Sequence, residues 1–107
     1  MKRSLLFAVG ILIAIPLTAI AQRTQSAKKY VKQGIERFSR NDIVGAIAEY
    51  DRAIGIDPKN ADAYLNRGKA RRAAGDLDGA IDDYEIGDGF RRVVYASRRG
   101  DAFVKVA

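Results

Sequence analysis

Residues 27–50 read AKKYVKQGIERFSRNDIVGAIAEY, and residues 61–84 read ADAYLNRGKARRAAGDLDGAIDDY. At an offset of 34 positions the two segments, extended to residues 55 and 89, align without a gap and share ten identical residues in 29 pairs. Ordinary composition would give about two identities by chance. The chain therefore contains an internal repeat, and a repeat of this length is the first clue to its architecture.

Each repeated segment has the pattern of two helices. In the first segment, apolar or small residues recur at the spacing of one helix face from Ala27 to Phe38, and a second such face runs from Ile43 to Ile54. Asp42 can cap the second helix, and Pro58 stops it and disfavours helical backbone at Asp57. Glycine and alanine recur at fixed places, which predicts close helix crossings with aromatic rings beside them.

The period and these residues resemble the tetratricopeptide repeat family. The positions that carry the resemblance are Tyr30, Gly34, Ala46 and Tyr50, their equivalents Tyr64, Gly68, Ala80 and Tyr84, and Asp57-Pro58. Two pairs of positions depart from the family pattern. Gln33 and Arg67 stand where the family usually has Leu, and Arg37 and Arg71 stand where it prefers Tyr.

The resemblance implies an all-α fold of helix-turn-helix repeats, stacked as a short right-handed solenoid with a terminal helix as its cap. We place the first repeat at residues 27–60 and the second at 61–89, after a short segment at 22–26. Residues 90–107 are either a partial third repeat or a capping helix, with one face formed by Val93, Ala96, Gly100, Phe103 and Ala107. As a cap, this helix would cover Leu77, Ile81 and Tyr84 at the end of the second repeat. A truncated piece of a longer array is the alternative.

The N-terminus has the features of a secretory signal peptide. Lys2 and Arg3 precede an apolar run from Leu5 to Leu17, and Ala19-Ile20-Ala21 ends the segment with small residues. We predict cleavage after Ala21, so that residues 1–21 are a signal peptide and the protein is periplasmic or secreted. The alternative is an uncleaved anchor. The 107 residues include no Cys and no His, which excludes thiol and histidine catalysis and Cys/His metal sites.

The basic charge is concentrated at one end of the chain. The formal net charge is +6; residues 22–88 are neutral, and residues 89–107 carry +4. The basic end could meet an acidic partner or an anionic surface, or it could be a solvated helix face. We expect no nucleic-acid binding, because no aromatic residues interleave with the arginines for base stacking.

Residues Asp76 to Glu85 resemble a calcium-binding loop in their carboxylates and their central glycine. The equivalent stretch of the first repeat, Asp42 to Ile47, keeps Gly-Ala-Ile without the acids. Repeat packing and helix capping therefore explain the pattern, and we predict no metal site. Asp82 and Asp83 are adjacent on a helix and point apart, so they do not form a catalytic pair. We predict no enzyme activity and no cofactor.

The resemblance implies a partner-binding inner surface formed by the first helix of each repeat. The residues predicted to line this surface are Lys28, Val31, Lys32, Ile35, Phe38, Asp62, Leu65, Asn66, Lys69, Arg72, Arg98, Asp101 and Lys105. Some family members clamp a peptide carboxylate with Lys and Asn. Asn66 and Arg98 match two such positions, whereas Val31, Ile35 and Val94 occupy the others, which argues against a full clamp.

These features together predict an exported protein-interaction module or assembly adaptor that binds a peptide or protein partner. The alternatives are a peripheral envelope protein held to an anionic surface by its basic C-terminal helix, and a remnant of a longer repeat protein. Oligomerisation through an exposed repeat end is also compatible with the sequence.

Overall fold

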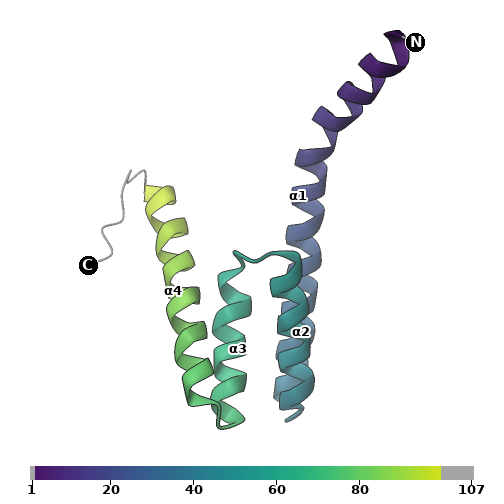
Figure 1. The fold of residues 1–107 in the computed structure, drawn as a ribbon. Coiled ribbons are helices and arrows are strands. Elements are labelled where there is room, and N and C mark those ends of the chain that lie inside the picture. Colours follow the sequence, from purple (N-terminus) through teal and green to yellow (C-terminus); the bar gives the residue numbers. More distant parts are fainter. Residues whose placement is uncertain (1, 100–107) are drawn as a thin grey trace.

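The computed structural model describes the backbone of residues 2–99 and the side chains of residues 17–99. Over this range the chain forms four α-helices: α1 (Lys2–Ser39), α2 (Ile43–Ile56), α3 (Ala61–Ala73) and α4 (Leu77–Arg99). Figure 1 shows them side by side as two hairpins, α1 with α2 and α3 with α4, with α2 next to α3. The all-α helical repeat fold is as predicted. In the part of the chain so described, no helix combines the length and apolar content that crossing a bilayer requires.

The turns between helices are set by local side chains and are equivalent in the two hairpins. Asp42 caps the N-terminus of α2 by accepting a hydrogen bond from the Gly45 amide at 3.0 Å. Asp76 caps α4 in the same way, accepting from the Gly79 amide at 3.0 Å. The residue before each of these caps has positive φ, Asn41 at 64° and Gly75 at 88°. Each turn therefore needs one left-handed residue followed by an acidic cap.

The junction between the hairpins ends α2 as predicted. Asp57, which precedes Pro58, has extended backbone at φ −130° and ψ 90°. Asn60 then caps α3, its side-chain oxygen accepting from the Ala63 amide at 3.0 Å. This short connection is what sets α3 beside α1 and α2.

Small residues and tyrosines make the core. Five alanines, at positions 27, 46, 53, 63 and 70, are fully buried, and Tyr50 is 1% exposed. A Cβ at Gly34 would collide with the Tyr50 ring, and one at Gly68 would lie 2.9 Å from Tyr84. The predicted close helix crossings with rings beside them are present at equivalent places in both hairpins.

The C-terminal part of the described chain differs from the prediction that the second repeat ends at residue 89. No separate helix begins at Phe90, because α4 continues through Gly87 and Gly89 to Arg99. Gly87 does not end the helix but lets it approach α3: a Cβ there would lie 2.7 Å from the Leu65 side chain. Phe90 packs beside the first turn of α3, with its ring 5.7 Å from that of Tyr64, and the rest of α4 continues past the start of α3 (Figure 1).

An extension of α4 cannot fold back over the outer face of α4 itself. Leu77 and Ile81, which the predicted cap was to cover, are 60% and 54% exposed. Residues 90–99 therefore do not cover this face, and the rest of the predicted cap at 90–107, including Gly100, Phe103 and Ala107, lies outside the described residues. The short segment at 22–26 is part of α1, directly before the first repeat.

Candidate functional site

A groove lies between α1 and α3, the first helices of the two hairpins. It encloses about 240 Å³. Its lining residues are Lys28, Val31, Lys32, Ile35, Asn60 and Asp62. All but Asn60 belong to the predicted partner-binding set, so the structure brings these five residues together around one cavity.

The chemistry of this groove is an apolar floor with a charged rim. Val31 is buried at 7% exposure and belongs to the core, whereas Ile35 is 47% exposed and offers its side chain to the cavity. Lys28 and Lys32 are exposed at the edge. The arrangement can accept one apolar side chain and place two ammonium groups near carboxylates beside it.

The α3 side of the groove is polar and already partly paired. Asp62 lies 3.4 Å from Arg91 of α4, and both side chains are exposed, so this ion pair adds little stability. Asn60, which sequence reasoning missed, has its side-chain oxygen committed to the α3 cap. The Asp-Pro-x-Asn sequence before an inner helix was the signal that could have placed Asn60 at this edge.

The other predicted residues do not line the groove. Phe38 is half-buried against the core, and Leu65 packs against Gly87. The Asn66 amide donates to the Asp62 carbonyl of its own helix at 2.8 Å. Lys69 and Arg72 are exposed on α3, and Asp101 and Lys105 lie outside the described residues.

Arg98, which was expected on the last helix, lies near the end of α4, the continuous helix that also forms the second hairpin. Among the helices described, α4 contacts only α3. Asn66 lies on α3 and Arg98 on α4, and neither lines the groove. Arg91, Arg92, Arg98 and Arg99 are all exposed along the end of α4, where Arg99 lies 5.7 Å from the centre of the Tyr95 ring.

A buried ionic network links α3 to α2 and α4. The Asp83 carboxylate is 1% exposed and accepts hydrogen bonds from Arg67 Nη2 at 2.8 Å, Arg67 Nε at 2.9 Å and Arg71 Nη1 at 3.0 Å. Arg67 Nη1 also donates to Asp51 of α2 at 2.8 Å. The bonds to Asp83 raise the pKa of Arg67 further above its ordinary value, against the effect of burial.

This network occupies the positions where the sequence departs from the family pattern, 67 and 71. Those departures were the available signal for it. Sequence reasoning nevertheless missed the network, because it considered Asp83 only with its neighbour Asp82. Asp76 caps α4, as predicted, and among the described side chains no cluster of three acidic residues is placed to hold a metal ion.

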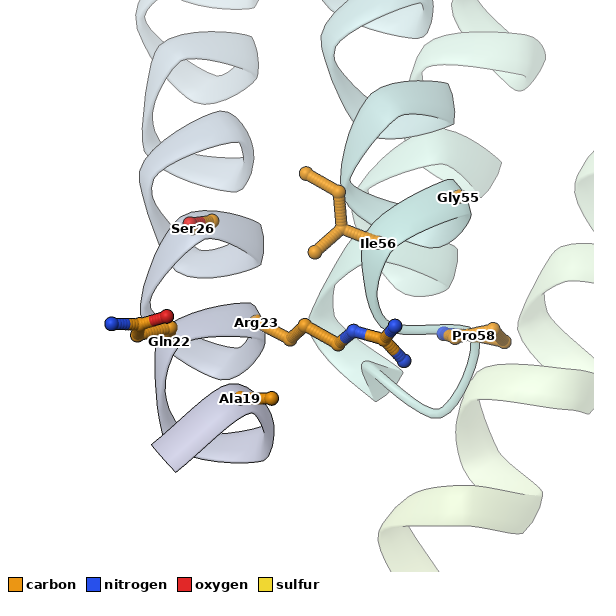
Figure 2. Close-up of a pocket in the computed structure, with 7 residues that line it drawn as sticks. All are labelled: Ala19, Gln22, Arg23, Ser26, Gly55, Ile56 and Pro58. Carbon is orange, nitrogen blue, oxygen red and sulfur yellow. The ribbon is translucent and has the colours of Figure 1, made fainter. Parts of the chain in front are cut away.

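A second cavity, of about 510 Å³, lies between α1 and the end of α2. Figure 2 shows the Arg23 side chain extending from α1 toward Pro58 at the end of α2. The other lining residues are Ala19, Gln22, Ser26, Gly55 and Ile56. No prediction from the sequence placed a cavity here. Its α1 wall includes residues on both sides of the predicted cleavage point.

Comparison with known families agrees with the fold. A family model described as TPR repeat matches residues 34–71, which span parts of both hairpins. The chain therefore contains tetratricopeptide repeat sequence, in keeping with its all-α helical repeat fold. Searches of curated proteins and of solved structures found no match. Tetratricopeptide repeats generally mediate protein–protein interaction, and the family is typically without enzyme activity.

Proposed function

We propose that this protein binds a protein partner in the groove between α1 and α3, and that the partner supplies an apolar side chain flanked by carboxylates. The observation that supports this most strongly is the exposed Ile35 in the groove, on the same side of α1 as Lys28 and Lys32. Aliphatic side chains on a rigid helix surface lose little entropy on binding, and nearby lysines favour acidic partners over basic ones.

Selection of displayed peptides on the immobilised full-length chain tests this proposal. We expect enriched peptides to contain an apolar residue with Asp or Glu within two positions. Ile35→Arg should weaken their binding at least tenfold. The matched control Val44→Arg, at an 81% exposed site on α2, should not weaken it.

Charge reversal provides the second arm of the test. Lys28→Glu with Lys32→Glu should shift the selected peptides from acidic to basic flanks. Lys29→Glu, at an exposed residue of α1 outside the groove lining, should leave the acidic preference unchanged. Peptides that bind equally well to Ile35→Arg and to the unaltered chain would refute the groove as the binding site.

We further propose that the chain is exported and cleaved after Ala21. Support comes from the order of Lys2-Arg3, the apolar run and Ala19-Ile20-Ala21. Cleavage there would leave every groove-lining residue in place, since the first of them is Lys28. It would remove Ala19 from the wall of the cavity in Figure 2, which is one reason to prefer the groove as the binding site.

Mass spectrometry of the protein from cell fractions tests this second proposal. The expected N-terminal residue is Gln22, intact or cyclised, in the periplasmic or secreted fraction. A chain that keeps residues 1–21 in the membrane fraction would instead support the uncleaved anchor.

A further inference from the structure

The outer face of α4 is apolar and exposed, whereas the equivalent face of α2 is covered. Leu77 and Ile81 are 60% and 54% exposed. Ile43 and Ile47 stand 34 positions earlier, and both are partly buried against the core that α2 shares with α3. Among the described helices α4 contacts only α3, and it stands at the end of the row in Figure 1. The face of α4 is therefore where the next helix of a repeat array would pack.

The apolar face continues toward the end of α4. Ile81 lies one turn after Leu77 on the same side of the helix. Tyr95 is 63% exposed and stands 18 residues after Leu77, which is about five turns and brings it back to this side. The face is thus about 27 Å long. A surface of this length fits a second helix better than it fits a single side chain.

A row of charged residues runs along one edge of this face at a seven-residue spacing: Asp78, Glu85, Arg92 and Arg99. Seven residues are close to two helical turns, so the four side chains follow one line, and all are exposed. The first two are acidic and the last two basic. Over the whole of α4, every charged residue before Gly89 is acidic and every one after it is basic.

We propose that α4 pairs with α4 of a second copy of this chain, antiparallel about a twofold axis near Gly89. Reversing the direction of the charged row exchanges acids for bases, so Glu85 of each copy faces Arg92 of the other. A parallel pair would place like charges opposite each other. Neither Glu85 nor Arg92 makes an ion pair with another described residue. Gly89 suits the axis because the structure leaves open space where its Cβ would be.

The outer face of α1 disfavours the other way of covering α4, a head-to-tail stack of copies. In that stack, α1 of the next copy would pack on α4 as α3 packs on α2. The α3 helix contributes Ala63 and Ala70, both fully buried. The equivalent residues of α1 are Lys29 and Glu36, both exposed. Burying these charges on an apolar face would be costly, whereas an α4–α4 pair avoids the cost and closes as a dimer.

Sedimentation velocity of the purified full-length chain over a range of concentrations is the first test. We expect a monomer–dimer equilibrium. Glu85→Arg should weaken the dimer at least tenfold, and so should Arg92→Glu. A chain with both changes exchanges the two charges and should recover the dimer. Glu36→Arg, the same change at an exposed position of α1, should have no effect.

Spin-label distances test the antiparallel orientation. The chain has no Cys, so a single introduced Cys carries a single label. Labels at Gly89→Cys lie beside the proposed axis. Labels at Ser97→Cys should be about 24 Å farther apart along the helix axis, because each stands eight residues farther from the centre in opposite directions. Equal label separations in the two variants would indicate a parallel pair and would overturn the proposal.

Two further results would also overturn it. One is a chain that stays monomeric at every concentration. The other is a dimer that Glu85→Arg does not weaken, which is the result expected if copies associate through the apolar run at residues 5–17 instead. Far-UV circular dichroism checks that each charge variant folds; if one does not, the spin-labelled chains decide, since they keep every charge. Because α4 does not line the groove, the outcome is independent of partner binding there.

Discussion

Removing the charge of Asp83 is expected to destabilise the fold strongly. The carboxylate is 1% exposed, and the side chains of its partners Arg67 and Arg71 are 15% and 28% exposed. Asp83→Asn keeps the shape but leaves two largely buried guanidinium groups without their counter-charge. Removing one member of a buried ionic network typically costs about 3–5 kcal/mol.

That cost is large for a chain of this size. A protein of 107 residues has a total stability of about 5–15 kcal/mol. In a domain of this length each kcal/mol shifts the melting midpoint by roughly 4–8 °C, so Asp83→Asn should lower it by at least about 12 °C. Thermal and urea unfolding of the full-length chain, followed by circular dichroism at the helix band, measures the change.

Two controls separate burial from charge. Asp51→Asn removes the other acceptor of Arg67, but the Asp51 side chain is 54% exposed, so the cost should be about 0–1 kcal/mol. Replacing the whole network with Arg67→Leu, Arg71→Tyr and Asp83→Leu should recover most of the lost stability, since apolar residues can replace a buried ionic network at little cost. An Asp83→Asn variant within about 1 kcal/mol of the unaltered protein would refute this reasoning.

Three further predictions concern the glycines, the turns and Tyr50. Gly34→Ala should cost about 1–3 kcal/mol in urea unfolding because the new Cβ collides with the buried Tyr50 ring, whereas Gly55→Ala, with nothing within 4 Å, should stabilise α2 by up to about 1 kcal/mol. Gly75→Ala should cost about 1–2 kcal/mol of stability because φ is positive at this position. Asn41→Gly, at the equivalent turn, should be neutral or slightly stabilising, since glycine adopts positive φ without strain. An equal loss of stability in both variants would contradict the need for a left-handed residue in each turn. Burial raises the pKa of Tyr50 above 10.0, so the unfolded chain loses this proton at a lower pH than the folded chain does. The free energy of unfolding should therefore keep the whole contribution of Tyr50 below pH 10 and lose it as the pH rises further. In alkaline urea titrations, Tyr50→Phe should remove this part of the pH dependence.

The repeat itself could be read from the sequence because its signals are local. Helix caps, the Asp57-Pro58 stop and the spacing of Gly34 and Tyr50 each act within one helix pair, so the 34-residue offset exposes them. The groove followed from the same logic: once the inner helices are known, Lys28, Lys32 and Ile35 must share the face toward α3.

The end of the second unit could not be read in the same way. Gly87 and Gly89 lower helix propensity, which favoured a break, but the close packing of Gly87 on Leu65 keeps α4 intact. The ionic network was hidden for a similar reason. Arg67 and Asp83 are 16 residues apart, and only the packing of α3 on α4 brings them into contact.

Site-specific crosslinking in the native host tests the central proposal, a partner bound in the groove, most directly. A photoreactive phenylalanine derivative at position 35 of the full-length chain should form a crosslink to a discrete protein. The crosslink should disappear when Lys28→Glu and Lys32→Glu are added, and the same group at position 44, on the outer face of α2, should form none. Crosslinks of equal yield at positions 35 and 44, or none at position 35, would contradict partner binding in the groove.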